Sequence, residues 1–252
     1  MPRNREMVAT ELQRIAEKAR SESGCRFTSL FHLMNIEMLR ECFWRLRKDA
    51  AAGIDKVTKE AYKENLEENL TALVEKLHRM SYIPLPVRRV YIPKPGSTKE
   101  RPLGIPALED KLVQAGLARI LTAIYEQDFI GDSYGFRPNR SCHDALRALS
   151  DEVEGQQIHY IVDADIKGFF DSVDHEWLMQ FLGHRIADKR VLRYVKRFLK
   201  AGIMEDGAVS ASDKEHRRVG LCHRFSPTSI CITALTFGLH GCFKKAVTAK
   251  AV

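Results

Sequence analysis

Four aspartates that follow a short apolar segment, past the middle of the chain, constrain the fold more than any other feature. Residues 160–162, Tyr-Ile-Val, have the length and composition of a buried β-strand. Asp163 and Asp165 come next, and alternation along a strand places both on one face. Asp171 and Asp174 follow closely, and clustered carboxylates suit a hard cation such as Mg²⁺, which prefers oxygen ligands. Alternatively these acids cap the following helix, with Asp174 as its N-cap.

The run around these acids is similar to a known catalytic motif. Residues 165–175 read Asp-Ile-Lys-Gly-Phe-Phe-Asp-Ser-Val-Asp-His, which closely resembles the first catalytic motif of bacterial group II intron reverse transcriptases. The resemblance implies that Asp165 is the catalytic aspartate that binds Mg²⁺. It also implies that Phe170 lies under the sugar of the incoming nucleotide and disfavours a 2′-hydroxyl.

Composition narrows the class of protein and of partner. The 252 residues are enough for a hydrophobic core in one large domain or two smaller lobes. Forty Lys and Arg against 33 Asp and Glu give a net charge of +7, which favours a polyanionic partner. We expect no membrane partner, because the chain has no run of 18 apolar residues and its start lacks a signal-peptide core. The six cysteines show no zinc-like spacing, so a reducing cytoplasm is the expected location.

Apolar residues recur every three or four positions along much of the chain, which predicts a mostly helical protein. Helices are expected over residues 7–24, 36–48, 107–127, 142–155, 175–184 and 188–200, and Thr58 should cap one further, long helix. Strands at 87–92 and 102–105 should form a hairpin, and a second hairpin should follow the turn at 201–207. These elements predict the α/β (α+β) class.

The first hairpin carries the most basic stretch of the sequence. Residues 87–101 contain five cations and one acid. Lys94 and Arg101 flank its loop, where they could hold phosphates, although the alternative is a solvated surface hairpin. The stretch Ile-Pro-Lys-Pro…Arg-Pro-Leu-Gly-Ile-Pro resembles the fingers motif of the same family, which implies that Lys94 and Arg101 bind the incoming triphosphate. We also expect Arg88 and Arg89, on the strand before the loop, to contact nucleic acid.

A second loop combines charge with aromatic rings. Residues 133–141 read Ser-Tyr-Gly-Phe-Arg-Pro-Asn-Arg-Ser. Arg137 and Arg140 suit a nucleic-acid backbone, while the adjacent rings suit base stacking. The alternative is an arginine packed on Tyr134 or Phe136. The loop resembles the family's Ser-Tyr-Gly-Phe-Arg-Pro loop, which implies a place near the template and nucleotide pocket.

The helix expected at 188–200 has a basic outer face, formed by Arg190, Arg193, Lys196, Arg197 and Lys200. Such a face could follow a phosphate backbone, but it is also what a solvated helix commonly shows. The sequence does not decide between these two interpretations.

The resemblance ends near residue 216. Residues 216–252 contain no Asp or Glu, and neither the family's Gly-Thr-Pro-Gln-Gly motif nor its Tyr-Ala-Asp-Asp motif is present. We expect a reading-frame change at 216–221 and a truncated product; the alternative is a divergent but selected tail. Two-metal phosphoryl transfer needs several carboxylates, so this chain alone should have negligible polymerase activity.

The resemblance implies a right-hand polymerase fold, with mostly helical fingers, a fingers β-hairpin and an incomplete palm. The expected divisions are an N-terminal extension with fingers at 1–156, a partial palm at 157–215 and an anomalous tail at 216–252. The implied function is RNA-directed DNA synthesis, with intron RNA template, DNA primer, deoxynucleoside triphosphates and Mg²⁺. The alternatives are a non-catalytic, maturase-like protein that binds intron RNA, and an unstable remnant without function.

Overall fold

The computed structural model describes residues 2–93, 96, 98, 100–155, 174–205 and 208–210. The first catalytic motif, with Asp163, Asp165 and Phe170, lies outside these residues, as do Lys94 and the tail 216–252. The predictions made for those positions are therefore not tested by the fold. Arg101 is described only through its backbone.

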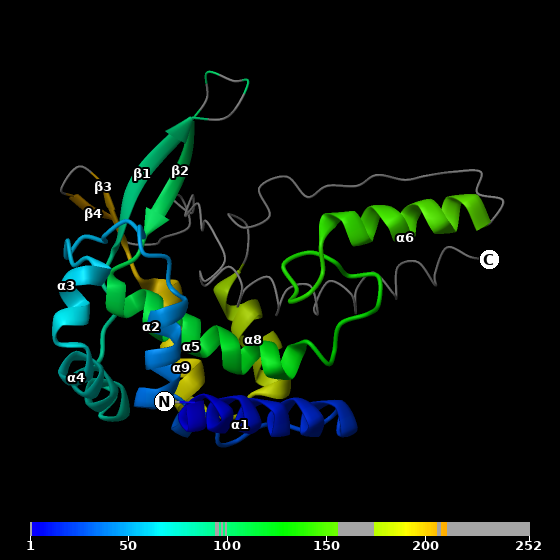
Figure 1. Cartoon of the computed structure of the whole chain (residues 1–252), viewed down its shortest axis with the longest axis horizontal. Coiled ribbons are helices and arrows are strands. Elements are labelled where there is room, and N and C mark those ends of the chain that lie inside the picture. The colour runs from blue at the N-terminus through cyan, green and yellow to red at the C-terminus, as the bar shows by residue number, and fades with distance from the viewer. Residues whose placement is uncertain are drawn as a thin grey trace.

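The described chain is mostly helical, as the periodicity predicts (Figure 1). Its helices are α1 (Pro2–Ser21), α2 (Ile36–Arg45), α3 (Lys59–Glu64), α4 (Leu66–His78), α5 (Leu108–Tyr125), α6 (Cys142–Gly155), α8 (His175–Arg185) and α9 (Lys189–Lys200), with a 3-10 turn at Phe31–Leu33. No helix in the described part of the chain is both long and apolar enough to cross a bilayer.

A small mixed sheet completes the described fold. Its strands are β1 (Val87–Pro93), β2 (Glu100–Ile105), β3 (Ile203–Glu205) and β4 (Ala208–Ser210), in the spatial order β2-β1-β3-β4. The predicted hairpin β1–β2 is antiparallel and extends away from the helices (Figure 1). β3 pairs in parallel with the start of β1, so the base of the hairpin is joined to the chain that follows α9.

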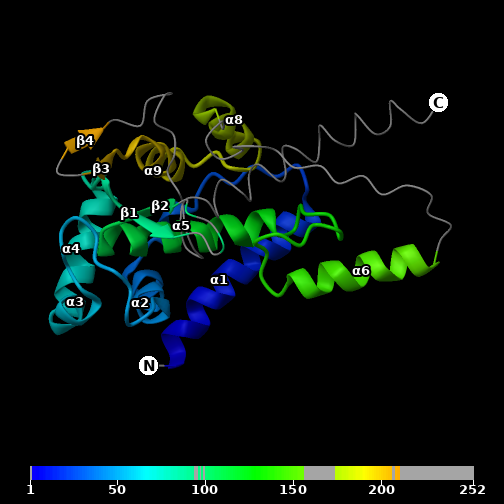
Figure 2. The same ribbon diagram turned by 90° about the horizontal axis from the view of Figure 1, so that it is seen from above.

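Helix α5 lies at the centre of the core. Its inward residues are buried as predicted: Leu112, Val113, Leu117, Ile120, Leu121 and Ile124. Figure 2 shows α8 and α9 on one side of α5, and α2 and α3 on the other. The Tyr125 hydroxyl donates to the Leu182 carbonyl oxygen at 3.2 Å, which joins the end of α5 to α8. A helix that is apolar on most of its surface is stable only when other helices cover it, and that requirement places α5 in the middle.

Two helix starts confirm predicted caps. The Thr58 hydroxyl accepts from the Ala61 N–H at 3.2 Å, and Asp174 Oδ1 accepts from Glu176 and Trp177 N–H groups at 2.7 and 3.1 Å. The long helix predicted after Thr58 is wrong in one respect, because it is divided at Asn65 into α3 and α4. The Asn69 amide donates to the Tyr62 carbonyl oxygen at 3.1 Å across the break and satisfies a backbone acceptor there.

Asp188 joins distant parts of the chain where α9 begins. Its Oδ1 accepts from the first-turn N–H groups of Arg190 and Val191, as an N-cap does. Its Oδ2 accepts from the Leu30 and Phe31 N–H groups at 2.7 and 2.9 Å. One buried carboxylate therefore holds the N-terminal segment against α9.

Arg185 fixes α1 to the same region. This buried guanidinium donates to the carbonyl oxygens of Ala19 and Glu22, at the end of α1, at 2.9 and 3.0 Å. Its Nε lies 3.1 Å from the Asp128 carboxylate, just after α5. A cation at a helix C-terminus is favoured by the helix dipole, so Arg185 stabilises α1 where α1 meets α5 and α8.

Candidate nucleic-acid interface

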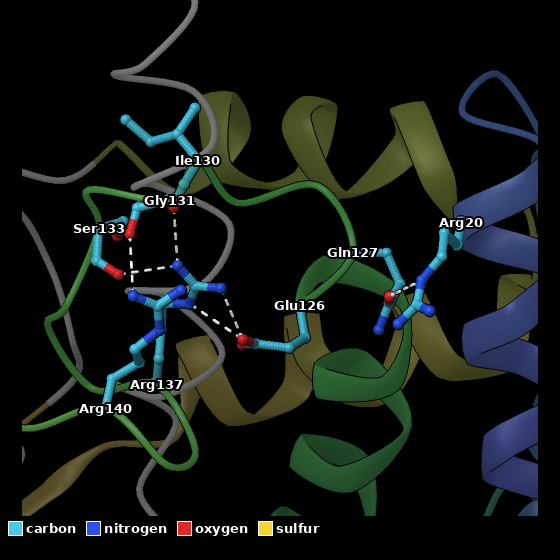
Figure 3. A network of polar contacts seen from close by, with 8 residues as sticks. All are labelled: Arg20, Glu126, Gln127, Ile130, Gly131, Ser133, Arg137 and Arg140. Carbon is cyan, nitrogen blue, oxygen red and sulfur yellow. Dashed lines mark hydrogen bonds and ion pairs between the residues drawn. The ribbon is translucent and has the colours of Figure 1, made fainter.

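Arg137 lies inside the loop that joins α5 to α6 (Figure 3). Its Nε and Nη2 donate to Glu126 Oε1 at 3.0 and 2.7 Å. Its Nη1 donates to the carbonyl oxygens of Ile130 and Ser133 at 2.8 and 2.7 Å. The side chain is only 7% exposed, and its guanidinium carbon lies 4.8 Å from the centre of the Phe129 ring. All these contacts are intramolecular, so the observed role of Arg137 is to hold the loop together.

The alternative of an arginine packed on Tyr134 is confirmed by Arg140, whose guanidinium carbon lies 5.2 Å from the centre of the Tyr134 ring. Arg137 packs on Phe129, a ring that the sequence did not suggest. Direct contact of Arg137 with a nucleic-acid strand stays a prediction.

Arg140 is more available to a ligand. Its Nη1 donates to the Gly131 carbonyl oxygen at 3.0 Å, and the residue is exposed (Figure 3). A guanidinium has five N–H donors, so this single bond leaves most of the fork for a phosphate. Arg140 is thus anchored on one side and can present its other donors to solvent.

Phe136 is the residue of this loop that sequence reasoning undervalued. Its side chain is 77% exposed and its backbone has a φ of 58°, in the left-handed region that non-glycine residues seldom occupy. Asn139, three residues later, has a φ of 57°. Strain of this kind persists only where surrounding contacts hold it, and the Arg137 contacts do so here. The loop therefore displays an aromatic ring to solvent, and only the flanking Gly and Pro hinted at this backbone.

The start of the loop is also tied to the N-terminal helix. Arg20 Nε, on α1, donates to the Gln127 side-chain oxygen at 2.9 Å (Figure 3). The two ends of the loop are thus held by α1 and by Glu126, while its middle carries the exposed ring.

The predicted hairpin arginines are held at the hairpin base. Arg88 donates to the Ala52 carbonyl oxygen from Nε and Nη2, at 3.2 and 2.9 Å. Arg89 forms an ion pair with Glu205 on β3 at 3.0 Å, and its side chain is 11% exposed. Glu205 also accepts from the Tyr91 hydroxyl. These contacts orient the hairpin, and nucleic-acid contact by Arg88 or Arg89 stays a prediction.

A buried acid, Asp110, binds the segment that precedes the hairpin. Asp110, in the first turn of α5, accepts from the Tyr82 hydroxyl at 2.6 Å and from the Leu85 N–H at 3.1 Å. Burial raises the Asp110 pKa from 3.8 to about 6, although both hydrogen bonds favour the charged form. Asp110 therefore fixes the segment that leads directly into β1.

The base of the hairpin and the 133–141 loop lie beyond opposite ends of α5. The hairpin precedes the first residue of α5, and the loop follows its last residue. At 1.5 Å per residue, the helix holds them about 27 Å apart along its axis. A ligand that reaches both must extend along the molecule, as a nucleic-acid strand does.

Asp165 lies outside the described residues, so its binding of Mg²⁺ stays a prediction. Asp174, the one acid of the motif within them, is used as a helix N-cap. Within the described residues, no group of three or more His, Cys, Asp or Glu is placed to hold a metal ion.

Comparison with known families agrees with the resemblance seen in the motifs. Residues 92–233 match the family model described as reverse transcriptase (RNA-dependent DNA polymerase). The matched segment is more than half of the chain and spans β2, α5, the 133–141 loop, α8 and α9. The chain therefore belongs to the reverse transcriptase family.

Its relatives place it among the group II intron-encoded members of that family. It is 36% identical over 196 residues to "Group II intron-encoded protein LtrA" of Lactococcus lactis subsp. cremoris, an alignment that covers 77% of this chain and 32% of that protein. It is also 36% identical over 219 residues to "Protein YkfC" of Escherichia coli (strain K12), covering 82% of this chain and 56% of YkfC. "Nuclear intron maturase 1, mitochondrial" of Arabidopsis thaliana is 30% identical over 95 residues, covering 38% of this chain and 13% of that protein. The chain thus spans about a third of LtrA and about half of YkfC.

Proposed function

We propose that this chain forms the fingers and part of the palm of a group II intron reverse transcriptase, which copies RNA into DNA. The observation that carries the proposal is the family match over residues 92–233, which includes Asp165 and the run that follows it. The reaction is attack of a primer 3′-hydroxyl on the α-phosphate of a deoxynucleoside triphosphate, with loss of pyrophosphate. When bound, Mg²⁺ supplies charge stabilisation and lowers the pKa of the attacking hydroxyl.

The roles follow the motifs. Asp165 would hold the metal ion, and Phe170 would exclude ribonucleotides by its position under the sugar. Lys94 and Arg101 would bind the triphosphate from the hairpin. The hairpin base, held by contacts of Arg88, Arg89 and Asp110, supports this role because groups that bind a phosphate need a fixed support.

The template would run along the far end of α5. Arg140 offers free guanidinium donors there, and Phe136 offers an exposed ring on which a base can stack. Arg137 would serve this site by holding the loop. The distance between hairpin and loop suits an extended strand with the nucleotide pocket at one end.

For the chain as it stands, we propose that synthesis itself is absent. Residues 216–252 carry no Asp or Glu, so the further carboxylates that a two-metal site needs cannot come from that segment. A reading-frame change near residues 216–221 accounts for this composition. Sequencing of the coding DNA tests it: a downstream frame that restores the Tyr-Ala-Asp-Asp motif is expected.

The proposed function is tested with a chimera. Residues 26–215 of this chain replace the matching segment of the Lactococcus protein, and primer extension is measured on an RNA template with Mg²⁺. We expect synthesis that Asp165→Asn abolishes, while the 252-residue chain alone gives none. A folded chimera whose activity survives Asp165→Asn would contradict the assignment, and Asp165-dependent synthesis by the chain alone would contradict its proposed inactivity.

A second candidate is a non-catalytic protein that binds intron RNA. It is favoured by the fold of the described N-terminal region, which Asp188 and Arg185 tie together. Filter binding at physiological salt should then show a preference for structured intron RNA over a generic duplex. Equal affinity for both RNAs would exclude this candidate.

A further inference from the structure

Helix α9 presents a continuous row of cations to solvent. Lys189, Arg190, Arg193, Lys196 and Lys200 are exposed, and the helix has no acid between Lys189 and Lys200. At about 100° per residue, these five side chains fall within an arc of roughly 120°. The row extends about 16 Å along the helix axis. The face opposite is buried through Val191, Tyr194, Val195 and Phe198.

Within the described part of the chain, this row of cations lacks acidic partners. Among the residues that the structure describes, none of these five cations forms an ion pair. Arg193 has like charges three residues before and after it, and such pairs on a helix destabilise it. Helix α1 shows the ordinary solvated pattern instead, with Glu11, Arg14, Glu17 and Lys18 alternating in sign. The α9 face is thus a positive surface that no described acid pairs with, and its like charges carry a cost in helix stability.

The structure also narrows the kind of partner. A helix that binds a bilayer inserts its apolar face, but the apolar face of α9 is already buried in the core. Base stacking needs exposed rings, and both aromatic residues of α9, Tyr194 and Phe198, are buried. What remains is a ligand whose own charges lie in a closely spaced row at its surface. A nucleic-acid duplex carries one negative charge for about every 1.7 Å of its axis.

We propose that the exposed face of α9 binds the phosphodiester backbone of a duplex, independently of its sequence. In an intron reverse transcriptase this duplex would be a helical segment of folded RNA. That identification rests on the proposed function, whereas the surface itself does not require an intact catalytic site. Helix α9 itself lies on the same side of α5 as α8 (Figure 2).

The test uses the full chain and two variants of equal charge. The first replaces Arg190, Arg193, Lys196 and Lys200 with Gln. The control replaces four exposed cations elsewhere with Gln: Lys18, Lys48, Lys56 and Lys63. Affinity for a 20-base-pair RNA hairpin stem of arbitrary sequence is measured from 50 to 300 mM KCl, with a DNA duplex of the same sequence as a second probe.

The α9 variant should bind the RNA stem at least about 10-fold more weakly at 150 mM salt, with the slope of log K against log[salt] smaller by about 3 to 4. The control should keep the slope of the unmodified chain. A matching loss for the DNA stem identifies the shared backbone as the ligand, and a larger loss for RNA identifies A-form RNA. The proposal is overturned if both variants lose affinity equally, or if polyglutamate or phosphatidylserine vesicles occupy the face as well as the stems do.

Thermal melting separates binding from folding. Removal of like charges should leave the α9 variant at least as stable as the unmodified chain. Duplex binding is measured without nucleotide or primer, so loss of polymerase activity in the chimera does not affect this result. An α9 variant that is folded and binds with an unchanged salt slope would overturn the proposal.

Discussion

The Arg137 guanidinium donates two hydrogen bonds to a single carboxylate oxygen of Glu126, at 3.0 and 2.7 Å. Glu126 caps the end of α5, and Arg137 lies eleven residues later in the loop. The pair therefore closes the base of the loop that displays Phe136. In this arrangement, any contribution of Arg137 to the proposed template site would come through the shape of the loop.

If the pair holds the loop, removing either member should loosen the loop. Glu126→Gln should weaken binding of single-stranded RNA and raise amide exchange in residues 127–141. Arg137→Gln should do so more strongly, because it also removes the bonds to the Ile130 and Ser133 carbonyl oxygens. Breaking this largely buried pair should cost about 1–3 kcal/mol locally, reduced by the partial exposure of Glu126. The double variant should bind no more weakly than Arg137→Gln alone, because Arg137→Gln already removes the interaction with Glu126. If Arg137 instead contacts RNA directly, Glu126→Gln will leave affinity unchanged or increase it.

Substitutions at Phe136 and Asn139 provide a test of the proposed template site and its matched control. Both have left-handed backbones, so Gly is tolerated at each position; it relieves less strain at Asn139, because Asn adopts this region more readily than Phe. Phe136→Gly should weaken single-stranded RNA binding by about 1–3 kcal/mol, because it removes a stacking ring. Asn139→Gly should leave affinity unchanged, and both variants should alter unfolding stability by less than about 1 kcal/mol. Equal losses of affinity would mean that loop shape, and not the ring, determines binding; fluorescence anisotropy and urea denaturation provide the two measurements.

The Asp110 pKa predicts how stability varies with pH. The folded state raises this pKa from 3.8 to about 6, so it binds the proton more tightly than the unfolded state does. Protonation of Asp110 therefore adds its full contribution to the free energy of unfolding below about pH 4. That contribution is lost as the pH rises from about 4 through 6, and it does not change further above that range. The difference corresponds to about 3 kcal/mol.

Asp110→Asn removes this titration. Between pH 4 and pH 7, the unmodified chain should lose about 3 kcal/mol of unfolding free energy relative to the variant, as measured by urea denaturation. The variant also loses an acceptor for Tyr82 or Leu85, which shifts its whole curve downward without changing its slope. Parallel curves for the two proteins would show that Asp110 titrates normally.

Sequence reasoning predicted the elements well where the pattern was local. Periodicity placed α2, α5 and α9 to within a few residues, and Thr58 and Asp174 are the caps that it named. The break at Asn65 was missed because it depends on the Asn69 side chain reaching a carbonyl seven residues earlier. The spacing of apolar residues carries no information about a hydrogen bond between a side chain and the backbone.

The sequence identified which residues belong to the candidate site better than it identified what each of them does. Arg88, Arg89 and Arg137 were expected to face nucleic acid, yet each binds a group within the chain: Ala52, Glu205 and Glu126 respectively. Ala52 and Glu205 are brought near the hairpin only by the path of the chain. The sequence shows where the arginines are, but only the folded structure shows which acceptor each guanidinium binds.

The last prediction concerns Gly53, whose backbone packs closely against the backbone of Ala107. The support of the hairpin depends on this close packing. A Cβ at Gly53 would lie 2.5 Å from the Ala107 Cα and 2.6 Å from the Ala107 N, at the start of α5. These are backbone atoms and cannot move aside as a flexible side chain can. The preceding residue, Ala52, accepts both Arg88 hydrogen bonds, so a shift here is passed to the hairpin.

Gly53→Ala should therefore destabilise the chain by about 1–3 kcal/mol, which is typical of an added methyl group without space. Gly24→Ala is the control, because a methyl group at that position would have nothing within 4 Å and its φ is not in the left-handed region; it should change stability by less than about 0.5 kcal/mol. Urea denaturation measures both, and amide exchange in β1 reports the hairpin. A Gly53→Ala variant as stable as Gly24→Ala would mean that the 51–53 segment is not held against α5, and Arg88 would then not support the hairpin through Ala52.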